Sequence, residues 1–186
     1  MTMLGPVGKL VVISGPSGAG KTSVCKKIKV DPRVEFSVSA TTRKIRPGEV
    51  DGVDYHFLSA EDFRRREENG EFLESAEYNG NHYGTLRKPM EDALAAGRVF
   101  ILEIEVQGTQ QLRDHGVEGD YIFIVPPSME ELRQRLADRK TNTDAEIEER
   151  LGIAAEEMKA ARLYDCQVPN DVLDDAVEAV RQRIGL

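Results

Sequence analysis

The sequence predicts an α/β fold in which a parallel sheet is covered by helices on both of its faces. Apolar runs typical of buried strands recur at about 10–14, 35–39, 99–104, 121–125 and 166–168, with helical segments between most of them. Hairpin-like β structure at about 41–98 interrupts this alternation. We therefore expect one domain with a core at about 1–40, 99–127 and 164–186, a β-rich insertion at about 41–98, and a helical lid at about 128–163.

A glycine-rich loop after the first strand carries the most specific single motif. The sequence Gly15-Pro16-Ser17-Gly18-Ala19-Gly20-Lys21-Thr22 matches the pattern G-x-x-x-x-G-K-[ST] at every fixed position. A glycine-rich turn that binds nothing is the alternative. The order strand, loop, helix is the context that the motif needs, so it favours a P-loop NTPase-type fold with a nucleoside triphosphate site.

The chemistry of this loop assigns roles to its residues. Its backbone N–H groups point at phosphate oxygens, and the following helix adds its positive dipole end. Lys21 would reach the terminal phosphates, and the Thr22 hydroxyl would ligate Mg²⁺. The segment expected to contact the triphosphate comprises Ser14, Gly15, Pro16, Ser17, Gly18, Ala19, Gly20, Lys21, Thr22 and Ser23.

The first half of the chain offers further element signals. A helix is expected from 22 to 30, a strand at 36–39 and a polar, basic loop at 41–48. A half-exposed strand at 54–58 precedes Ser59-Ala60-Glu61-Asp62, a capping sequence whose helix ends near Asn69-Gly70.

In the second half, an alanine-rich helix is expected at 89–96 and a strand at 99–106. Capping boxes at Ser128 and Thr143 begin helices that end near 138 and 163. A short strand near 167–168 and a helix from about 173 complete the chain.

A hairpin is predicted in the middle of the insertion. Two strand-like segments, 72–78 and 81–85, are separated by Asn79-Gly80, which is typical of a two-residue type I′ turn. That turn places Tyr78 opposite Asn81, Ala76 opposite Tyr83 and Glu74 opposite Thr85. Because opposed residues share one side of a sheet, Glu74, Tyr83 and Thr85 are expected on the same face.

A second phosphate site is suggested by Arg43, Arg46, Tyr55 and Tyr83. Guanidinium groups match phosphate oxygens bidentately, and a phenol adds one more donor. A solvated basic loop beside two half-buried tyrosines explains the same residues equally well.

Glu74, Thr85 and Ser39 suggest which base accompanies that phosphate. A carboxylate can accept from both N1–H and the 2-amino group of guanine, while hydroxyl groups donate to O6. Adenine offers the reverse pattern and would leave the carboxylate facing an acceptor, a mismatch of several kcal/mol by order of magnitude. A cross-strand Glu–Thr pair that faces water is the simpler alternative.

Two acids and three arginines complete the candidate site. Glu103 and Glu105 lie at the end of the strand at 99–106. An acid at this place beside a phosphate loop usually holds Mg²⁺ or one of its waters. The sequence spacing does not show which of the two has this role. Arg135, Arg139 and Arg150 lie on the two lid helices and could supply charge to the transferred group. Surface ion pairs with neighbouring glutamates would explain each arginine singly.

Composition sets the limits. A net charge of −8 over 186 residues excludes a general nucleic-acid binder, which needs a basic face, but not a small phosphorylated ligand. No apolar run approaches the ~20 residues of a membrane span, and the start lacks a signal-peptide pattern, so we expect no membrane association and a cytoplasmic location. Cys25 and Cys166 have neither disulfide nor metal spacing.

Taken together, these segments resemble the guanylate kinase family of nucleoside monophosphate kinases, from about Leu10 to about Ala179. The resemblance is carried by Ser14 to Thr22, Val38-Ser39-Ala40-Thr41-Thr42-Arg43, Arg46-Pro47-Gly48-Glu49, Gly52-Val53-Asp54-Tyr55, Glu74, Tyr83-Gly84-Thr85, Leu102-Glu103-Ile104-Glu105-Val106-Gln107-Gly108, Val125-Pro126-Pro127-Ser128 and Asn170-Asp171.

The resemblance implies phosphorylation of GMP by ATP with Mg²⁺. Arg43, Arg46, Tyr55 and Tyr83 would hold the GMP phosphate; Ser39, Glu74 and Thr85 would read guanine. Lys21, Arg43, Arg135, Arg139 and Arg150 would be catalytic, Asn170 would lie near adenine, and Glu103 would reach Mg²⁺ through water. The family usually has Asp at the position of Glu105, close to GMP, and an aliphatic residue at that of Pro169.

Two other classes of function stay open at this point. One is a non-enzymatic guanylate-kinase-like binding module, which would lack parts of the phosphate loop that are present here. The other is a P-loop kinase with a different phosphorylated acceptor, such as a sugar bisphosphate or another nucleotide. The sequence leaves a monomer and a homo-oligomer equally open.

Overall fold

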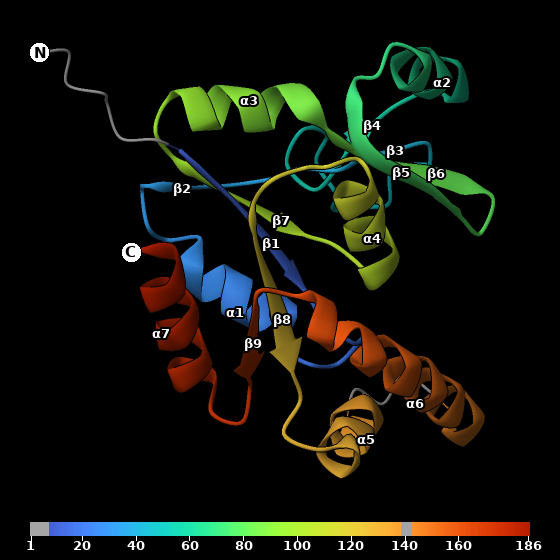
Figure 1. The fold of residues 1–186 in the computed structure, drawn as a ribbon. Coiled ribbons are helices and arrows are strands. Elements are labelled where there is room, and N and C mark those ends of the chain that lie inside the picture. The colour runs from blue at the N-terminus through green and yellow to red at the C-terminus, as the bar shows by residue number, and fades with distance from the viewer. Residues whose placement is uncertain (1–7, 139–142) are drawn as a thin grey trace, which may run out of the picture.

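The computed structural model describes residues 8–138 and 143–186 (Figure 1). A five-stranded parallel sheet lies at the centre, in the order β2-β7-β1-β8-β9. Its strands are β1 (Lys9–Ser14), β2 (Val34–Phe36), β7 (Val99–Glu103), β8 (Asp120–Val125) and β9 (Cys166–Pro169). The predicted parallel α/β core is confirmed.

Each face of this sheet has its own apolar core, because side chains along β1 alternate between the faces. Val11 and Ile13 pack with α1 (Lys21–Ile28) and α7 (Leu173–Ile184). Leu10 and Val12 pack with α3 (Arg87–Ala95) and α4 (Val106–Asp114) on the opposite face. The sheet is therefore buried on both sides, as an all-parallel sheet requires.

The insertion forms a second sheet of four strands in the order β4-β3-β6-β5. Its elements are β3 (Ala40–Thr41), β4 (His56–Phe57), α2 (Ala60–Glu68), β5 (Phe72–Tyr78) and β6 (Asn81–Leu86). A small core of Ala40, Phe63 and Phe72 lies between α2 and this sheet.

The hairpin has the predicted turn and register. Asn79 and Gly80 have φ angles of 50° and 70°, as a type I′ turn requires. Glu74 is paired with Thr85, and Ala76 with Tyr83. A register shift between Phe72 and Glu74, which the sequence did not predict, bends the strand before Glu74.

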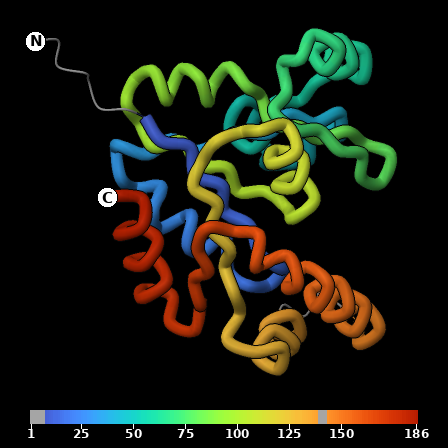
Figure 2. Tube along the Cα trace, in the orientation of Figure 1, coloured from blue at the N-terminus to red at the C-terminus, as the bar shows by residue number. Residues whose placement is uncertain are grey.

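The lid consists of α5 (Met129–Asp138), α6 (Asp144–Lys159) and the 3-10 helix η1 (Ala160–Leu163). Both predicted capping boxes lie at helix starts: Ser128 Oγ accepts from Glu131 N at 3.0 Å, and Thr143 forms a complete capping box with Glu146. Leu132, Leu136, Ile147, Leu151 and Ala154 form a core between α5 and α6. In Figure 2 the second sheet with α2 (teal to green) and the lid (orange) lie on the side of the core away from α7 (red), whereas α3 packs on the main sheet.

Two predicted strand boundaries are wrong. The strand expected at 36–39 lies at 34–36, because the chain then leaves the main sheet and Ala40 and Thr41 pair with β6 and β4 instead. The strand expected at 99–106 ends at Glu103, and α4, which the sequence did not predict, begins at Val106. Within the described ranges no helix is both long and apolar enough to cross a membrane.

Candidate active site

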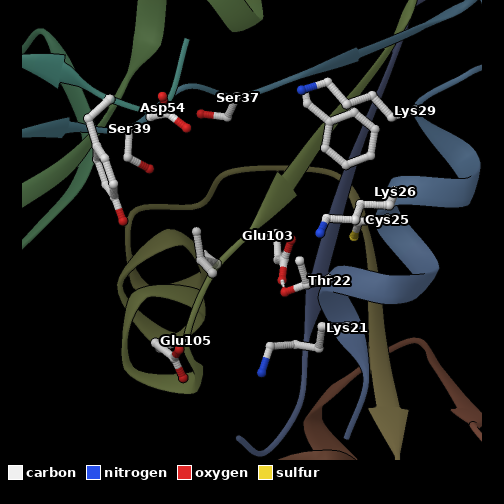
Figure 3. A pocket seen from close by; sticks show the side chains of 13 residues that line it. Lys21, Thr22, Cys25, Lys26, Lys29, Ser37, Ser39, Asp54, Glu103 and Glu105 are labelled. Carbon is white, nitrogen blue, oxygen red and sulfur yellow. Dashed lines mark hydrogen bonds between the residues drawn. The ribbon is translucent and has the colours of Figure 1, made fainter. Parts of the chain in front are cut away.

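A cavity of about 410 Å³ lies between the phosphate loop and the insertion (Figure 3). Six of the predicted site residues line it: Lys21, Thr22, Ser39, Tyr55, Glu103 and Glu105. They come from the start of α1, the segment around β3 and β4, and the end of β7. Residues as far apart in the sequence as Lys21 and Glu105 thus meet at the carboxyl edge of the sheet. Ligands bind at this edge in this class of fold.

The backbone of the phosphate loop accepts hydrogen bonds from its own lysine and from a residue that follows β9. Lys21 is 9% exposed, and its Nζ donates to Gly15 O at 2.5 Å and to Pro16 O at 3.2 Å. Asn170, just after β9, donates from Nδ2 to Ala19 O at 2.7 Å. Gly20 has a φ of 91°, and a Cβ there would lie 2.2 Å from Asn170 Nδ2, so only glycine fits. The Asn170 side chain is therefore engaged with the loop backbone.

Thr22 and Glu103 form a pair of oxygen donors beside the loop. Thr22 Oγ1 donates to Glu103 Oε1 at 2.6 Å, and Figure 3 shows the two side chains meeting in the cavity. A hydroxyl and one carboxylate suit Mg²⁺, which usually takes one or two protein oxygens and completes its shell with phosphates and water. The described part of the chain holds no group of three or more metal-ligating acid, His or Cys side chains. Thr22 and Glu103 therefore fit a Mg²⁺ ion whose remaining ligands come from outside the protein.

Arg43 lies among aromatic rings and is oriented by a carboxylate. Its guanidinium donates to Glu49 through Nη1 at 3.0 Å and Nη2 at 2.8 Å. The same group lies 5.3 Å from the Tyr55 ring centre, and the Tyr55 and Tyr83 rings are 6.2 Å apart. Glu49 raises the pKa of Arg43, and Arg43 lowers that of Glu49. Three of the four predicted phosphate-site residues thus cluster.

Arg46 differs from these three. Its backbone N donates to Glu49 Oε2 at 2.7 Å, while its side chain is exposed. Glu49 therefore connects the backbone of Arg46 to the side chain of Arg43, a link that the sequence did not predict as part of the site.

Glu74 and Thr85 form a side-chain pair on the hairpin. Thr85 is fully buried, and its hydroxyl donates to Glu74 Oε1 at 2.6 Å. Burial raises the pKa of Glu74, and the hydrogen bond from Thr85 opposes this effect. The predicted Glu–Thr pair is thus present, with Thr85 buried and Glu74 half-buried, so the pair is partly shielded from water. The pair lies against α4, outside the lining of the 410 Å³ cavity.

The two strand acids have different positions. Glu103 is the last residue of β7 and is half-buried. Glu105 occupies the N-cap position of α4 and is exposed. Glu103 rather than Glu105 contacts Thr22. The structure therefore distinguishes the two acids, whereas their spacing in the sequence left both open as the acid beside the metal.

Of the predicted lid arginines, Arg135 forms hydrogen bonds with protein groups. Arg135 donates from Nη2 to Asn170 O at 3.0 Å and from Nε to Glu131 Oε1 at 3.1 Å. Arg150 is half-buried and close enough to Glu146 to lower the pKa of that carboxyl. Arg139 lies outside the described residues. The first contact ties α5 to the segment that holds the phosphate loop.

Several residues that line the cavity were not predicted. Ser37 lies two residues before Ser39 on an extended segment, and Lys26 lies one helical turn after Thr22. Both spacings place a side chain on the same face as a predicted site residue, so periodicity alone could have found them. Asp54, whose Oδ2 accepts from Val50 N at 2.7 Å, gave no such signal.

Comparisons with known proteins agree on one family. The family model described as guanylate kinase matches residues 7–185. The guanylate kinase of Desulfitobacterium hafniense is 46% identical over 175 residues, which cover 94% of this chain and 88% of that protein. The guanylate kinase of Clostridioides difficile is 48% identical over 165 residues, covering 88% and 80%.

Solved structures give the same result. The crystal structure of guanylate kinase from Anaplasma phagocytophilum is 34% identical, has a TM-score of 0.74, and is matched over 99% of this chain and 88% of that one. Shikimate kinase from Bacteroides thetaiotaomicron, at 17% identity and a TM-score of 0.51 over 96% and 99% of the two chains, shares the fold alone. With family model, relatives and structure in agreement over nearly its whole length, this chain belongs to the guanylate kinase family.

Proposed function

We propose that this enzyme transfers a phosphoryl group from ATP to GMP, giving ADP and GDP, and that it also accepts dGMP. The observation that carries the proposal is a single cavity lined by both a phosphate-loop lysine, Lys21, and the insertion residues Ser39 and Tyr55. Two phosphorylated ligands bound from its two sides would meet end to end. This supports a two-substrate kinase over a binding module.

The acceptor side is assigned to the insertion. Arg43, Tyr55 and Tyr83 would bind the GMP phosphate, with Arg46 joining them from the exposed loop. Glu74 would accept from N1–H and the 2-amino group of guanine, and Ser39 and Thr85 would contact the same base. The desolvated carboxylate of Glu74 supports this role, because it gains most from two donors.

The donor side is assigned to the phosphate loop, which comprises residues 15–22. Lys21 would move from the loop carbonyls to the terminal phosphates. Thr22 and Glu103 would hold Mg²⁺, which supplies charge neutralisation and alignment of the phosphates when bound. Asn170 would support the loop beside the adenine end rather than contact the base with its side chain.

The chemistry requires no general base in this proposal. The acceptor is a phosphate oxygen that is already largely ionised at pH 7, since the second phosphate pKa is near ~6. The transfer is direct and in line, without a covalent enzyme intermediate. Lys21, Arg43, Arg135, Arg139 and Arg150 would act by screening the repulsion between two anions and aligning them.

Closure of the insertion (41–98) and the lid (128–163) would exclude water and limit wasteful hydrolysis of ATP. A cytoplasmic location, where both nucleotides are available, suits this reaction. The active unit is proposed to be a complete site within one chain, in a monomer or a homo-oligomer.

An assay of ADP release tests this function. GMP, dGMP, AMP, CMP, UMP and ribose 5-phosphate are each offered with ATP and Mg²⁺. We expect GMP to be the best acceptor and dGMP to be used. A rate with AMP as high as with GMP would contradict the assignment of Glu74, and turnover that survives in Lys21→Ala would remove the phosphate loop from the mechanism.

A further inference from the structure

The edge strand of the second sheet, β5, is attached to the core helix α4, and the proposed function gives this attachment no role. In the order β4-β3-β6-β5, the strand β5 has a strand partner on one side only. An edge strand presents N–H and C=O groups on its outer side, and these groups need other partners. Helix α4, which follows β7 in the core, supplies two such partners (Figure 1).

A side chain of α4 and the side chain of its C-cap residue form hydrogen bonds with the backbone of β5. Gln111 Oε1 accepts from Ser75 N at 3.3 Å. His115, the C-cap residue, has its Nδ1 at 3.3 Å from Leu73 O. Because a carbonyl oxygen only accepts, Nδ1 of His115 carries the proton of this contact. Gln111 and His115 are four residues apart, which places both on one side of α4.

These two hydrogen bonds flank Glu74, the residue between Leu73 and Ser75. Leu73 is also buried in the apolar core that contains Leu112 of α4. Gly108, on the same helix, has no side chain, and a Cβ there would lie 3.2 Å from Glu74 Oε2. Glu74 is therefore positioned against α4 by the residues before and after it.

Helix α4 also begins in the active site. Its N-cap residue, Glu105, lines the 410 Å³ cavity. The preceding strand β7 ends at Glu103, whose carboxylate contacts Thr22 beside the phosphate loop. One helix thus connects the proposed metal site to the strand that carries Glu74. The position of Glu74 relative to the phosphate loop therefore depends on α4 as well as on the hairpin.

We propose that Gln111 and His115 are positioning residues for the recognition of guanine. They hold β5 in one place on α4, so that the Glu74 carboxylate meets N1–H and the 2-amino group of the base at the same time. Acceptance from two donors needs both of them aligned, whereas a single hydrogen bond tolerates a shifted carboxylate. This inference rests on the proposed function, because it requires that Glu74 reads guanine.

A purely structural role for these contacts predicts a different result. If Gln111 only stabilises the insertion, its loss weakens the use of every acceptor by the same factor. If it positions Glu74, its loss weakens an acceptor with two donors more than an acceptor with one. Inosine 5′-monophosphate (IMP) is the suitable comparison, because its base keeps N1–H and O6 but lacks the 2-amino group. The ratio of kcat/KM for GMP to kcat/KM for IMP therefore separates the two roles.

The test measures this ratio in the wild type, Gln111→Met and Gln110→Met. Methionine is unbranched like glutamine and has a similar helix propensity, but it removes the strong acceptor for Ser75 N. We expect the ratio to fall by about three- to tenfold in Gln111→Met, the factor that one neutral hydrogen bond contributes, with KM for ATP unchanged. Gln110 is the adjacent residue, exposed and bonded to Asp114 at 2.8 Å, so its variant is the matched control and should keep the wild-type ratio.

Two further variants test the inference if Gln111→Met is poorly folded. His115→Ala removes the donor to Leu73 O from an exposed position, so the fold is at little risk, and the ratio should again fall. His115→Asn offers an amide N–H close to the place of Nδ1 and should therefore retain most of the wild-type ratio. Such a rescue would attribute the effect to the hydrogen bond rather than to the imidazole ring.

Several outcomes overturn the inference. An unchanged ratio in folded Gln111→Met contradicts it, as does an unchanged ratio in His115→Ala if Gln111→Met does not fold. A ratio that falls as far in Gln110→Met also contradicts it. A wild-type protein that uses IMP as well as GMP would refute the guanine-reading role of Glu74 in the proposed function. A wild type that prefers GMP, with the same preference in the variants, refutes this inference alone.

Discussion

The hydroxyl of Thr85 donates a 2.6 Å hydrogen bond to Glu74 Oε1 across the β5–β6 hairpin. The other carboxylate oxygen, Oε2, lies so close to α4 that a Cβ added to Gly108 would be 3.2 Å from it. The hydroxyl of Thr85 therefore orients one carboxylate oxygen, and the missing side chain of Gly108 leaves room for the other.

Glu74→Gln tests whether this group reads guanine. The amide NH₂ would face N1–H and the 2-amino group of guanine, donor against donor, so we expect kcat/KM for GMP to fall by about 10²–10⁴-fold. Because a desolvated charge is removed, the unfolding temperature should stay the same or rise. The measurements are ADP-release kinetics and thermal unfolding. Glu77→Gln, on an exposed position of the same strand, is the control and should behave as the wild type.

The raised pKa of Glu74 predicts a pH dependence. Only the ionised form accepts from both guanine donors, so KM for GMP should rise as the pH falls toward the pKa of Glu74, which burial raises from its ordinary value. The stability contribution has the opposite sign. The folded state holds this proton more tightly than the unfolded state, so the contribution to the unfolding free energy is largest at low pH and decreases as the pH rises through the folded-state pKa.

The phosphate of GMP also titrates near ~6, so the profile needs a reference. In Glu74→Gln only the phosphate remains to titrate. A difference between the wild type and Glu74→Gln in the dependence of KM on pH measures the contribution of the Glu74 carboxyl. Identical profiles would contradict its role in binding guanine.

Sequence alone predicted those parts of the site that local rules determine. The two-residue turn Asn79-Gly80 fixes the register of the whole hairpin, and with it the pairing of Glu74 with Thr85. Likewise, the motif at 15–22 places Lys21 at the start of a helix without reference to the rest of the chain. The prediction of the guanylate kinase family, which rested on such local motifs, is confirmed by the family model and the relatives.

The parts that sequence missed depend on contacts between distant segments. Glycine lowers helix propensity, so Gly108 weakened the signal for α4, yet the absence of a side chain there leaves room for Glu74. The chain leaves the main sheet after Phe36 because β3 finds partners in β4 and β6, which no local pattern records. The contacts of Asn170 with Ala19 and of Arg135 with Asn170 O likewise join segments far apart in the sequence.

Glu49→Gln tests the orientation of Arg43. Glu49 accepts from both terminal nitrogens of Arg43 and also from the backbone of Arg46. An uncharged amide cannot accept both guanidinium bonds, so Arg43 should lose its fixed orientation and KM for GMP should rise by about tenfold, with a smaller change in kcat. Steady-state kinetics with varied GMP measures this. Asp51→Asn, in the same loop, is the control, and an equal rise in that variant would attribute the effect to the loop as a whole.

The contact between Thr22 and Glu103 predicts which acid serves Mg²⁺. Glu103→Gln should raise the Mg²⁺ concentration for half-maximal activity by about 10- to 100-fold, because oxygens that orient a metal or its waters have effects of that size. The affinity for ATP measured without Mg²⁺ should stay unchanged, since no metal is then involved, and this provides a readout besides activity. Glu105→Gln is the matched variant, two residues further on in the same cavity lining. A larger shift in the Mg²⁺ requirement for Glu105→Gln than for Glu103→Gln would reverse the assignment, because it would mean that the N-cap acid of α4, and not the end of β7, lies next to the metal.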